Sequence, residues 1–373
     1  MRSLTALRMV IHDRSSTAGS LLGVVAIVFL VGQQLSILFG LLNYMSVLVD
    51  HSGADAWIMS RNARNADAGF LISDRYIDRI IGLPEVAWAE PVLIGNGLFR
   101  TTDGSYESVR VVGSRRPRFA GGPWRFAQSN EDALLDLESV TVDRLDLDKL
   151  GNPGLEEITE IGERRVRVRA VTEGARGFQG TLVFASIEKV REIARTPAGM
   201  ASVILVRFVD GSNAAATLAK LRTIMSFASV YSTAELAHRT RLYYFTNTGI
   251  GGSFGFSTVI AVLIGVVIIS LTMYTSVLGR TQDFAVMRAI GGRKWDIAVV
   301  VFVEALIITG VGLFAGFLML AALLNTTGNS SIPSYLPGVV PPVLAAGTLI
   351  VSLLGSAIAL RTALKADPAA VFH

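Results

Sequence analysis

Long apolar blocks are the strongest pattern in this sequence of 373 residues. Four of them hold almost no charged residue. Each has close to, or more than, the ~18–20 residues with which a helix crosses a hydrocarbon core about 30 Å thick. Strands of a membrane barrel would be about half as long and would alternate apolar with polar residues. The pattern therefore predicts transmembrane helices over residues 18–45, 251–279, 297–324 and 343–361.

The first apolar block could instead belong to a signal peptide, because Arg2, Arg8 and Arg14 precede it. A signal peptide has an apolar core of only about 7–15 residues, which a cleavage site of small residues follows promptly. The block is longer than that, and no such site follows it promptly. We therefore interpret it as a transmembrane helix.

Polar residues concentrate between the first and second apolar blocks, over residues 46–250. Alternating apolar residues predict strands there, among them Tyr106–Gly113 and Arg164–Val171, and helical spacing predicts helices such as Ser186–Arg195. The mixture predicts an α+β domain of about 200 residues, in one lobe or two. The predicted fold class is thus a helical membrane protein with this domain inserted between its first and second helices.

Two details of the inserted domain are predicted from local composition. Val86–Ile94 and Gly97–Thr102 form two separate predicted strands. The stretch Gly113–Trp124 is rich in Arg, Pro and Gly, which predicts a surface connection. Its three arginines could bind an anion, but a solvated loop is the favoured interpretation.

Basic residues predict the orientation of the four helices. The N-terminal segment 1–17, the loop 280–296 and the C-terminal end of the chain, from Arg361 to residue 373, carry nine of the 34 Lys and Arg residues, whereas the loop 325–342 carries no charge. Both termini and the loop 280–296 are therefore predicted to be cytoplasmic, and the domain 46–250 and the loop 325–342 to lie outside. The segment 1–17 is predicted to be amphipathic and the segment 362–373 to be a tail.

The net charge of +4 comes from the membrane part of the chain. The domain keeps the other 25 of the 34 basic residues and 25 of the 30 acidic residues, so it is neutral. A basic surplus confined to segments beside the membrane is typical of positive-inside topology. It therefore does not indicate nucleic-acid binding.

Most catalytic and metal-binding motifs are missing from these 373 residues. There is no cysteine, no P-loop and no dinucleotide-binding glycine motif, and the four histidines are scattered. Gly251–Gly255 reads G-x-S-x-G around Ser253, but a nucleophile elbow needs a strand before the serine and a helix after it. We therefore predict no catalytic residue, no metal site and no directly bound cofactor.

Glycine pairs and one acid stand out inside the apolar blocks. Gly251 with Gly255, and Gly312 with Gly316, have the G-x-x-x-G spacing that lets helices approach closely. Glu304 lies about two turns inside the third block. An acid at this depth could relay protons, although a structural role in pairing or capping is favoured.

The loop 280–296 contains a short amphipathic helix that ends at the glycine pair Gly291-Gly292. Apolar residues at helical spacing would give it one apolar face. Such a helix could rest in the membrane interface or dock into a groove of a partner protein.

The run RTQDFAVMRAIGGRKWDI, with Glu304 after it, resembles the R-x-x-[DE]-[FI]-[AG]-x-[ML]-[RK]-A-[IL]-G segment of FtsX/MacB-type (type VII) ABC transporter permeases. The layout of one helix, a large outside domain and three more helices is also similar. His12-Asp13-Arg14 near the start resembles the DevC-like members. Phe284-Ala285 departs from the frequent Ile-Gly, and Gly292 from the frequent Ala.

The resemblance implies a permease subunit of an exporter in the bacterial inner membrane. Two copies, forming a homodimer, would pair with a dimer of a separate ATPase, which alone would bind ATP. They would pass its motion to their periplasmic domains and a periplasmic adaptor that leads to an outer-membrane channel. The implied ATPase-coupling residues are Asp283, Phe284, Met287, Arg288, Ile290 and Gly291.

Two other functions stay open at this point. An FtsX-like regulator would transmit ATPase motion to a cell-wall hydrolase or a sensor kinase without transport. The cell-division members of the family have a much shorter outside domain, so the ~200 residues found here favour the exporter. A membrane hydrolase acting through Ser253 is the least favoured of the three.

Overall fold

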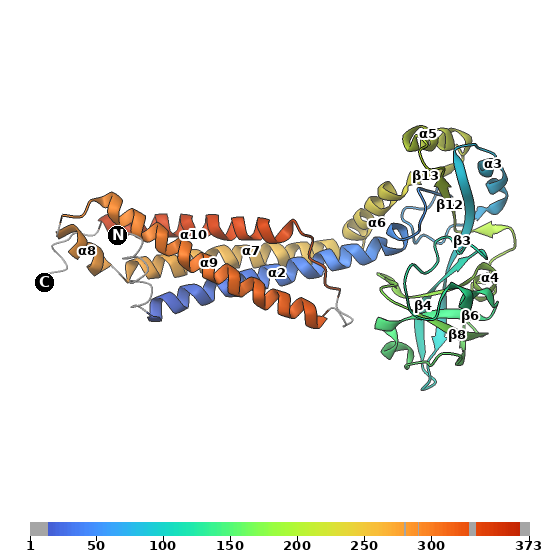
Figure 1. Cartoon of the computed structure of the whole chain (residues 1–373), viewed down its shortest axis with the longest axis horizontal. Coiled ribbons are helices and arrows are strands. Elements are labelled where there is room, and N and C mark those ends of the chain that lie inside the picture. Colours follow the sequence, from blue (N-terminus) through green and yellow to red (C-terminus); the bar gives the residue numbers. More distant parts are fainter. Residues whose placement is uncertain (1–13, 280, 290, 328–332, 366–373) are drawn as a thin grey trace. The chain divides into compact units, whose positions relative to one another are not determined.

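The computed structural model describes residues 14–279, 281–289, 291–327 and 333–365 (Figure 1). The chain divides into two compact units. One comprises Met1–Gly40 with Gly251–His373, and the other comprises Leu41–Ile250. We call them the helical unit and the inserted domain. The predicted N-terminal segment and C-terminal tail lie largely outside the described residues.

The helical unit contains four helices that are long and apolar enough to cross a membrane. They are α2 (Arg14–Asp50), α7 (Ile250–Leu278), α9 (Lys294–Thr327) and α10 (Val340–Lys365), and the short helix α8 (Thr281–Ala289) lies between α7 and α9. The prediction of four such helices around an inserted domain is confirmed. Their ends differ from the predicted spans, because a helix continues into polar sequence where nothing breaks it. Thus α2 continues to Asp50, and α10 begins with Pro341 and Pro342 in its first turn, where a missing N–H costs little.

The inserted domain is built on one large mixed sheet, in the strand order β13-β1-β12-β3-β4-β10-β6-β8-β5. Its strands are β1 (Ala56–Ser60), β3 (Val86–Arg100), β4 (Tyr106–Ser114), β5 (Phe126–Gln128), β6 (Ser139–Asp143), β7 (Ile158–Ile161), β8 (Arg164–Thr172), β9 (Arg176–Gly177), β10 (Gly180–Ser186), β12 (Val203–Phe208) and β13 (Ala228–Ser232). A separate pair joins β2 (Ile72–Ser73) to β11 (Met200–Ala201). The predicted α+β class is therefore confirmed.

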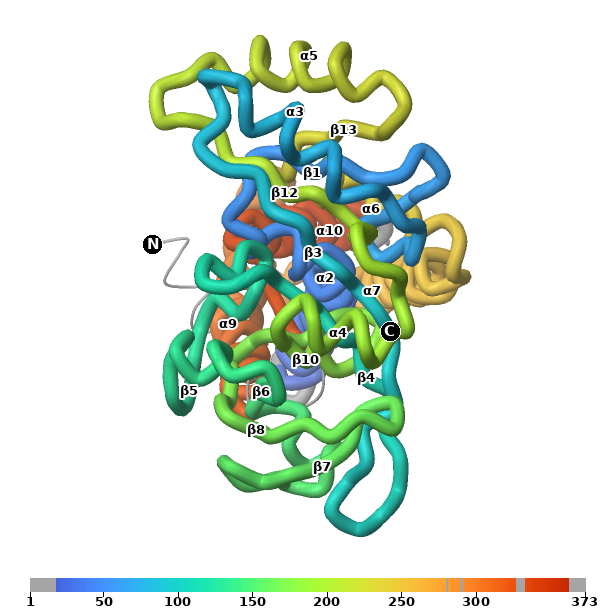
Figure 2. The backbone as a smooth tube through the Cα atoms, turned by 90° about the vertical axis from the view of Figure 1, so that its right-hand side faces the viewer, coloured from blue at the N-terminus to red at the C-terminus, as the bar shows by residue number. Residues whose placement is uncertain are grey.

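Helices cover the sheet, as Figure 2 shows for α3, α4 and α5. These three are α3 (Ile77–Ile81), α4 (Ile187–Ile193) and α5 (Ala214–Ile224), and α6 (Thr233–Asn247) follows β13. Alternation along β1 separates two cores: Ile58 packs with residues of α3 and α5, whereas Trp57 packs with the end of α2 and with α6. Short 3-10 turns complete the domain at Asp74–Tyr76, Glu131–Leu135, Arg144–Asp146 and Asp148–Leu150.

Strand β3 joins the two halves of the sheet and corrects one prediction. Val86–Ile94 and Gly97–Thr102 were expected to be two strands, but the structure has one strand, from Val86 to Arg100. The glycines serve close packing here. A Cβ on Gly95 would lie 2.7 Å from the Cβ of Ala194, and one on Gly97 would lie 2.5 Å from Ile161 Cγ2. The first half of β3 pairs with β12 and the second with β4.

The prediction that Gly113–Trp124 is a surface connection is wrong for its second half. Residues 119–123 are buried, and Ala120 belongs to the core that contains Trp57. The N–H of Gly121 donates to Ser52 O at 3.2 Å, and the Trp124 ring stacks on His51 with centroids 4.4 Å apart. Composition was misleading because the arginines lie in the first half of the stretch, and the buried apolar residues Phe119 and Ala120 follow them.

Two of the three arginines of this stretch contact other residues of the domain. Arg116 donates to Leu135 O at 2.6 Å, and the Arg118 guanidinium lies 5.6 Å from the centre of the Trp88 ring. Two of the three are thus held by separate contacts.

Candidate functional site

The short helix α8 ends in a tight turn that leads directly into α9. Gly291 has a φ of +95°, a conformation that favours glycine. The N–H of Gly291 donates to Arg288 O at 3.1 Å, and that of Gly292 donates to Met287 O at 2.9 Å. A Cβ on Gly292 would lie 2.6 Å from Met287 O, so both glycines are needed for the turn.

Helix α8 has one buried face and one exposed face. Phe284 and Ala285 are 4% and 8% exposed, and Phe284 packs with Val277 of α7, Ile297 and Val301 of α9, and Ala359 and Leu360 of α10. Gln282 and Asp283 are exposed, and Val286 is 54% exposed. The Phe284 ring is buried between α7, α9 and α10, so it fixes α8 to the bundle. The opposite face of α8 remains exposed.

Glu304 lies in α9 and is 4% exposed. Its Oε1 accepts a hydrogen bond from Ser276 Oγ of α7 at 3.3 Å. A second buried polar contact joins Thr309 of α9 to Ser352 of α10, with 2.6 Å between the two hydroxyl oxygens. A polar contact between helices is a means of holding them together in lipid. The hydrogen bond to α7 is a contact that the structural role requires, and both roles of Glu304 stay predictions.

Two of the predicted packing glycines lie where helices α9 and α2 meet. A Cβ on Gly312 would lie 2.6 Å from Val24 Cγ1, and one on Gly316 would lie 2.8 Å from Val28 Cβ. The two glycines, four residues apart on α9, therefore pack against two valines that are four residues apart on α2. Gly251 is buried and Gly255 is half-buried in the first turns of α7.

The surroundings of Ser253 do not fit a nucleophile elbow. The serine is exposed in the first turn of α7, and helix α6 precedes that helix in the chain. An elbow needs a strand immediately before the serine. The hydrolase hypothesis therefore has no support from the fold. Among the described residues, no group of three His, Cys, Asp or Glu side chains could hold a metal ion.

Family models match almost the whole chain. The model of the MacB-like periplasmic core domain matches residues 17–224, and the model of the FtsX-like permease C-terminal region matches residues 255–368. The chain belongs to the FtsX/MacB-type permease family. It is therefore an ABC-type permease and a multi-pass membrane protein.

Solved structures similar to this permease are distant. The periplasmic region of MacB from Actinobacillus actinomycetemcomitans is 13% identical, with a TM-score of 0.38, and the match covers 50% of this chain and 93% of that one. The extracellular domain of the noncanonic ABC-type transporter YknZ from Gram-positive bacteria is 11% identical, with a TM-score of 0.35, over 48% of this chain and 98% of that one. Among curated proteins, none matches. The family models alone carry the assignment.

The predicted coupling residues of the permease fall into three groups. Asp283 and Gly291 are exposed, and Met287 and Arg288 are half-buried. Phe284 is buried, so it offers little surface to a partner and acts as an anchor for α8. Ile290 lies outside the described residues.

Sequence reasoning missed two exposed residues of α8, Gln282 and Val286. At about 100° per residue, positions two before and two after the buried Phe284 point to the opposite face of the helix. The sequence signal for an exposed surface on α8 was therefore an apolar residue, Val286, on the face opposite Phe284.

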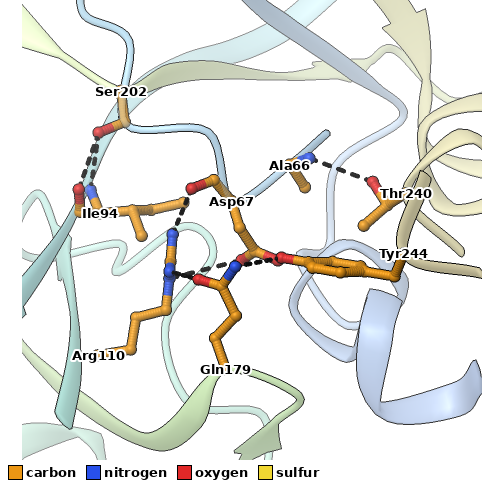
Figure 3. Close-up of polar contacts among 8 residues, drawn as sticks. All are labelled: Ala66, Asp67, Ile94, Arg110, Gln179, Ser202, Thr240 and Tyr244. Carbon is orange, nitrogen blue, oxygen red and sulfur yellow. Dashed lines mark hydrogen bonds and ion pairs between the residues drawn. The ribbon is translucent and has the colours of Figure 1, made fainter. Parts of the chain in front are cut away.

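A polar cluster in the inserted domain of the permease was also missed (Figure 3). The Arg110 guanidinium donates to Gln179 Oε1 and to Asp67 O, and its Nε lies 3.5 Å from Asp67 Oδ1. Tyr244 Oη donates to Asp67 Oδ2 at 2.7 Å and accepts from Gln179 Nε2 at 2.6 Å. We call these four residues the Arg110 cluster.

The Arg110 cluster joins β4, α6 and two connecting segments. Arg110 is 6% exposed and Tyr244 is 2% exposed. Burial raises the pKa of Tyr244, and the neighbouring Asp67 carboxylate raises it further. The phenol therefore stays protonated and remains a donor to Asp67. Because the four residues are far apart in sequence, no local motif marks the cluster.

Proposed function

We propose that this permease is the membrane subunit of an ABC exporter of the mechanotransmission type. ATP hydrolysis by a separate ATPase would move α8, and the helical unit would pass the motion to the inserted domain. The observation that carries the proposal is the two-faced α8, which is buried at Phe284 and exposed at Asp283 and Val286. Membership of an ABC permease family supports an ATPase as the partner for the exposed face.

Short connections support α8 as the element that receives the motion. Two residues separate the end of α7 from the start of α8, and four separate the end of α8 from the start of α9. Phe284 adds contacts to α7, α9 and α10. A push on the exposed face would therefore reach three helices without a long flexible linker to absorb it.

Two covalent routes lead from the helical unit to the inserted domain. Helix α2 continues without a break from Arg14 to Asp50, across the boundary between the two units at residue 40. The return route through α6 and α7 is interrupted between Asn247 and Ile250, where Gly249 has a φ of +73°. We infer that α2 transmits force along its axis, whereas the break at Gly249 allows α6 and α7 to bend.

The remaining parts of the assembly follow from the same proposal. The permease would form a homodimer on a dimer of ATPase subunits in the bacterial inner membrane, with both termini cytoplasmic and the inserted domain in the periplasm. A periplasmic adaptor would lead the substrate to an outer-membrane channel, as expected for a DevC-like exporter. The uncharged loop 325–342 and the basic loop 280–296 support this orientation.

Copurification tests the proposal. The tagged full chain, extracted in mild detergent from its own cells, should retain an ABC ATPase. The two subunits should be present in a 1:1 ratio, because the proposed assembly contains a permease dimer and an ATPase dimer. A Met287→Glu variant should lose most of the ATPase, because the new carboxylate would lie beside the exposed face of α8. Recovery of the intact, folded permease without any ATPase would contradict the proposal.

A further inference from the structure

The strongest unassigned feature of the inserted domain is an open cavity of about 790 Å³ beside the Arg110 cluster. One wall is the segment between β1 and β2, which contributes Arg61, Arg64 and Asn65. The other wall is the end of α6 and the residues after it, with Tyr243 and Thr248. This volume lies within the range of small-molecule sites, which is about 300–1,000 Å³.

The cavity has an excess of positive charge. Asp67 is the one acidic residue among those that line it, and Arg110 and the Tyr244 hydroxyl already pair with that carboxylate (Figure 3). Arg61 and Arg64 are exposed. Arg61 donates to Ser226 O, and Arg64 forms no ion pair with any residue that the structure describes. The Arg64 guanidinium and the other N–H groups of Arg61 are therefore available to an anion.

A buried acceptor without a partner lies in the same wall. Asn65 is 6% exposed, and its Oδ1 has no hydrogen-bond partner among the described residues. A buried acceptor in that state costs about 1–3 kcal/mol unless a ligand or a water donates to it. A ligand that fits both features therefore carries a negative group for the arginines and a hydroxyl or amine donor for Asn65.

The wall that contains Asn65 is held in place before any ligand arrives. The N–H of Ala66 donates to Thr240 Oγ1 of α6 at 3.1 Å, as Figure 3 shows. Ala63 and Ala66 are buried in the core of the domain. The residues between β1 and β2 are thus fixed on both sides of Arg64 and Asn65. A fixed site loses less conformational entropy on binding.

We propose that this cavity binds a phosphate ester that also carries a hydroxyl or amine donor, such as a glycerophosphate group. A lipid headgroup and a free glycerophosphate share this chemistry. Thr248 is two residues before Ile250, where the candidate span of α7 begins. At ~3.6 Å per residue, the wall at Thr248 is within about 7 Å of that span. Phe70, which is 47% exposed, adds apolar surface at the cavity.

Calorimetric titration of the full chain in uncharged detergent tests the proposal. The probes are sn-glycerol 3-phosphate, and mixed micelles that contain short-chain phosphatidylglycerol or short-chain phosphatidylcholine. Saturation by glycerol phosphate identifies the free ester as a ligand. Binding of phosphatidylglycerol alone identifies the lipid headgroup. Either result supports the site, whereas equal binding of phosphatidylcholine, which has no hydroxyl or N–H donor, would overturn it.

Matched variants keep the test specific to the cavity. Arg61→Gln with Arg64→Gln should weaken binding about tenfold or more, because two charge-assisted contacts are lost. Asn65→Ala should weaken it about fivefold. Arg75→Gln with Arg195→Gln removes the same charge from exposed positions outside the cavity and should change nothing. If the two double variants bind alike, the site is not the one proposed.

The proposal does not depend on coupling to an ATPase. The titration uses the permease alone, without ATP or any ATPase, so failure to bind the ester leaves the coupling role of α8 untouched. A permease that binds the ester but retains no ATPase would contradict the proposed function and leave the cavity site standing. Equal unfolding temperatures of all variants show that each one is folded.

Discussion

A Val286→Glu variant should bind the partner ATPase at least about tenfold more weakly than the unchanged permease does. Val286 is 54% exposed on the face of α8 opposite the buried Phe284, so the change adds a charge without opening the bundle. At the centre of a protein interface, a buried unpaired charge costs about 2 kcal/mol or more. The dissociation constant of the purified permease–ATPase pair measures the effect, and the unfolding temperature of the permease should change little.

The control for this prediction is Val209→Glu. Val209 is 42% exposed and belongs to the inserted domain, so the same substitution adds the same charge at a distant part of the chain. This variant should retain full affinity for the ATPase. Equal affinities of the two variants would show that the exposed face of α8 does not form the contact.

An Arg110→Leu variant should destabilise the inserted domain by about 3–5 kcal/mol. Arg110 is buried with Asp67, Gln179 and Tyr244, and its loss leaves the Asp67 carboxylate without its cation. For a domain of this size, such a loss lowers the unfolding temperature by roughly 10 °C. Circular dichroism of the full chain during heating measures it as the loss of the strand signal.

Two further variants separate the buried charge from a general effect of losing an arginine. Adding Asp67→Asn to Arg110→Leu should restore at least half of the lost stability, because no unpaired charge then remains. Arg195→Leu removes an arginine that is 75% exposed and paired with the exposed Glu163, and it should cost less than about 1 kcal/mol. A double variant as unstable as Arg110→Leu would argue against an unpaired charge as the cause.

Much of the helical unit could be predicted, because its signals are local. A helix that crosses lipid must pair its own backbone groups and expose apolar side chains, so its length and composition are written in consecutive residues. The same is true of the turn after α8, where Gly291 takes the positive φ that ends a helix. Periodicity predicted the apolar face of α8 that contains Phe284, but it did not show that residues of α7, α9 and α10 would cover Phe284.

The inserted domain was harder to predict because its decisive contacts join distant parts of the chain. No local pattern indicates that Gly95 and Gly97 pack close to the end of α4 and to β7, and two strands were predicted where the structure has one. Similarly, the Arg110 cluster joins residues between 43 and 177 positions apart. Register and partner choice of this kind depend on the whole sheet, which no local pattern records.

Site-specific photo-crosslinking measures most directly whether α8 lies on an ATPase. A photoreactive amino acid would replace Val286 in one sample and Val209 in another, in cells that express the permease at its natural level. The proposed function predicts a crosslink from position 286 to an ABC ATPase and none from position 209. An α8 that faces only lipid, or the absence of an ATPase among the crosslinked proteins at position 286, would contradict it.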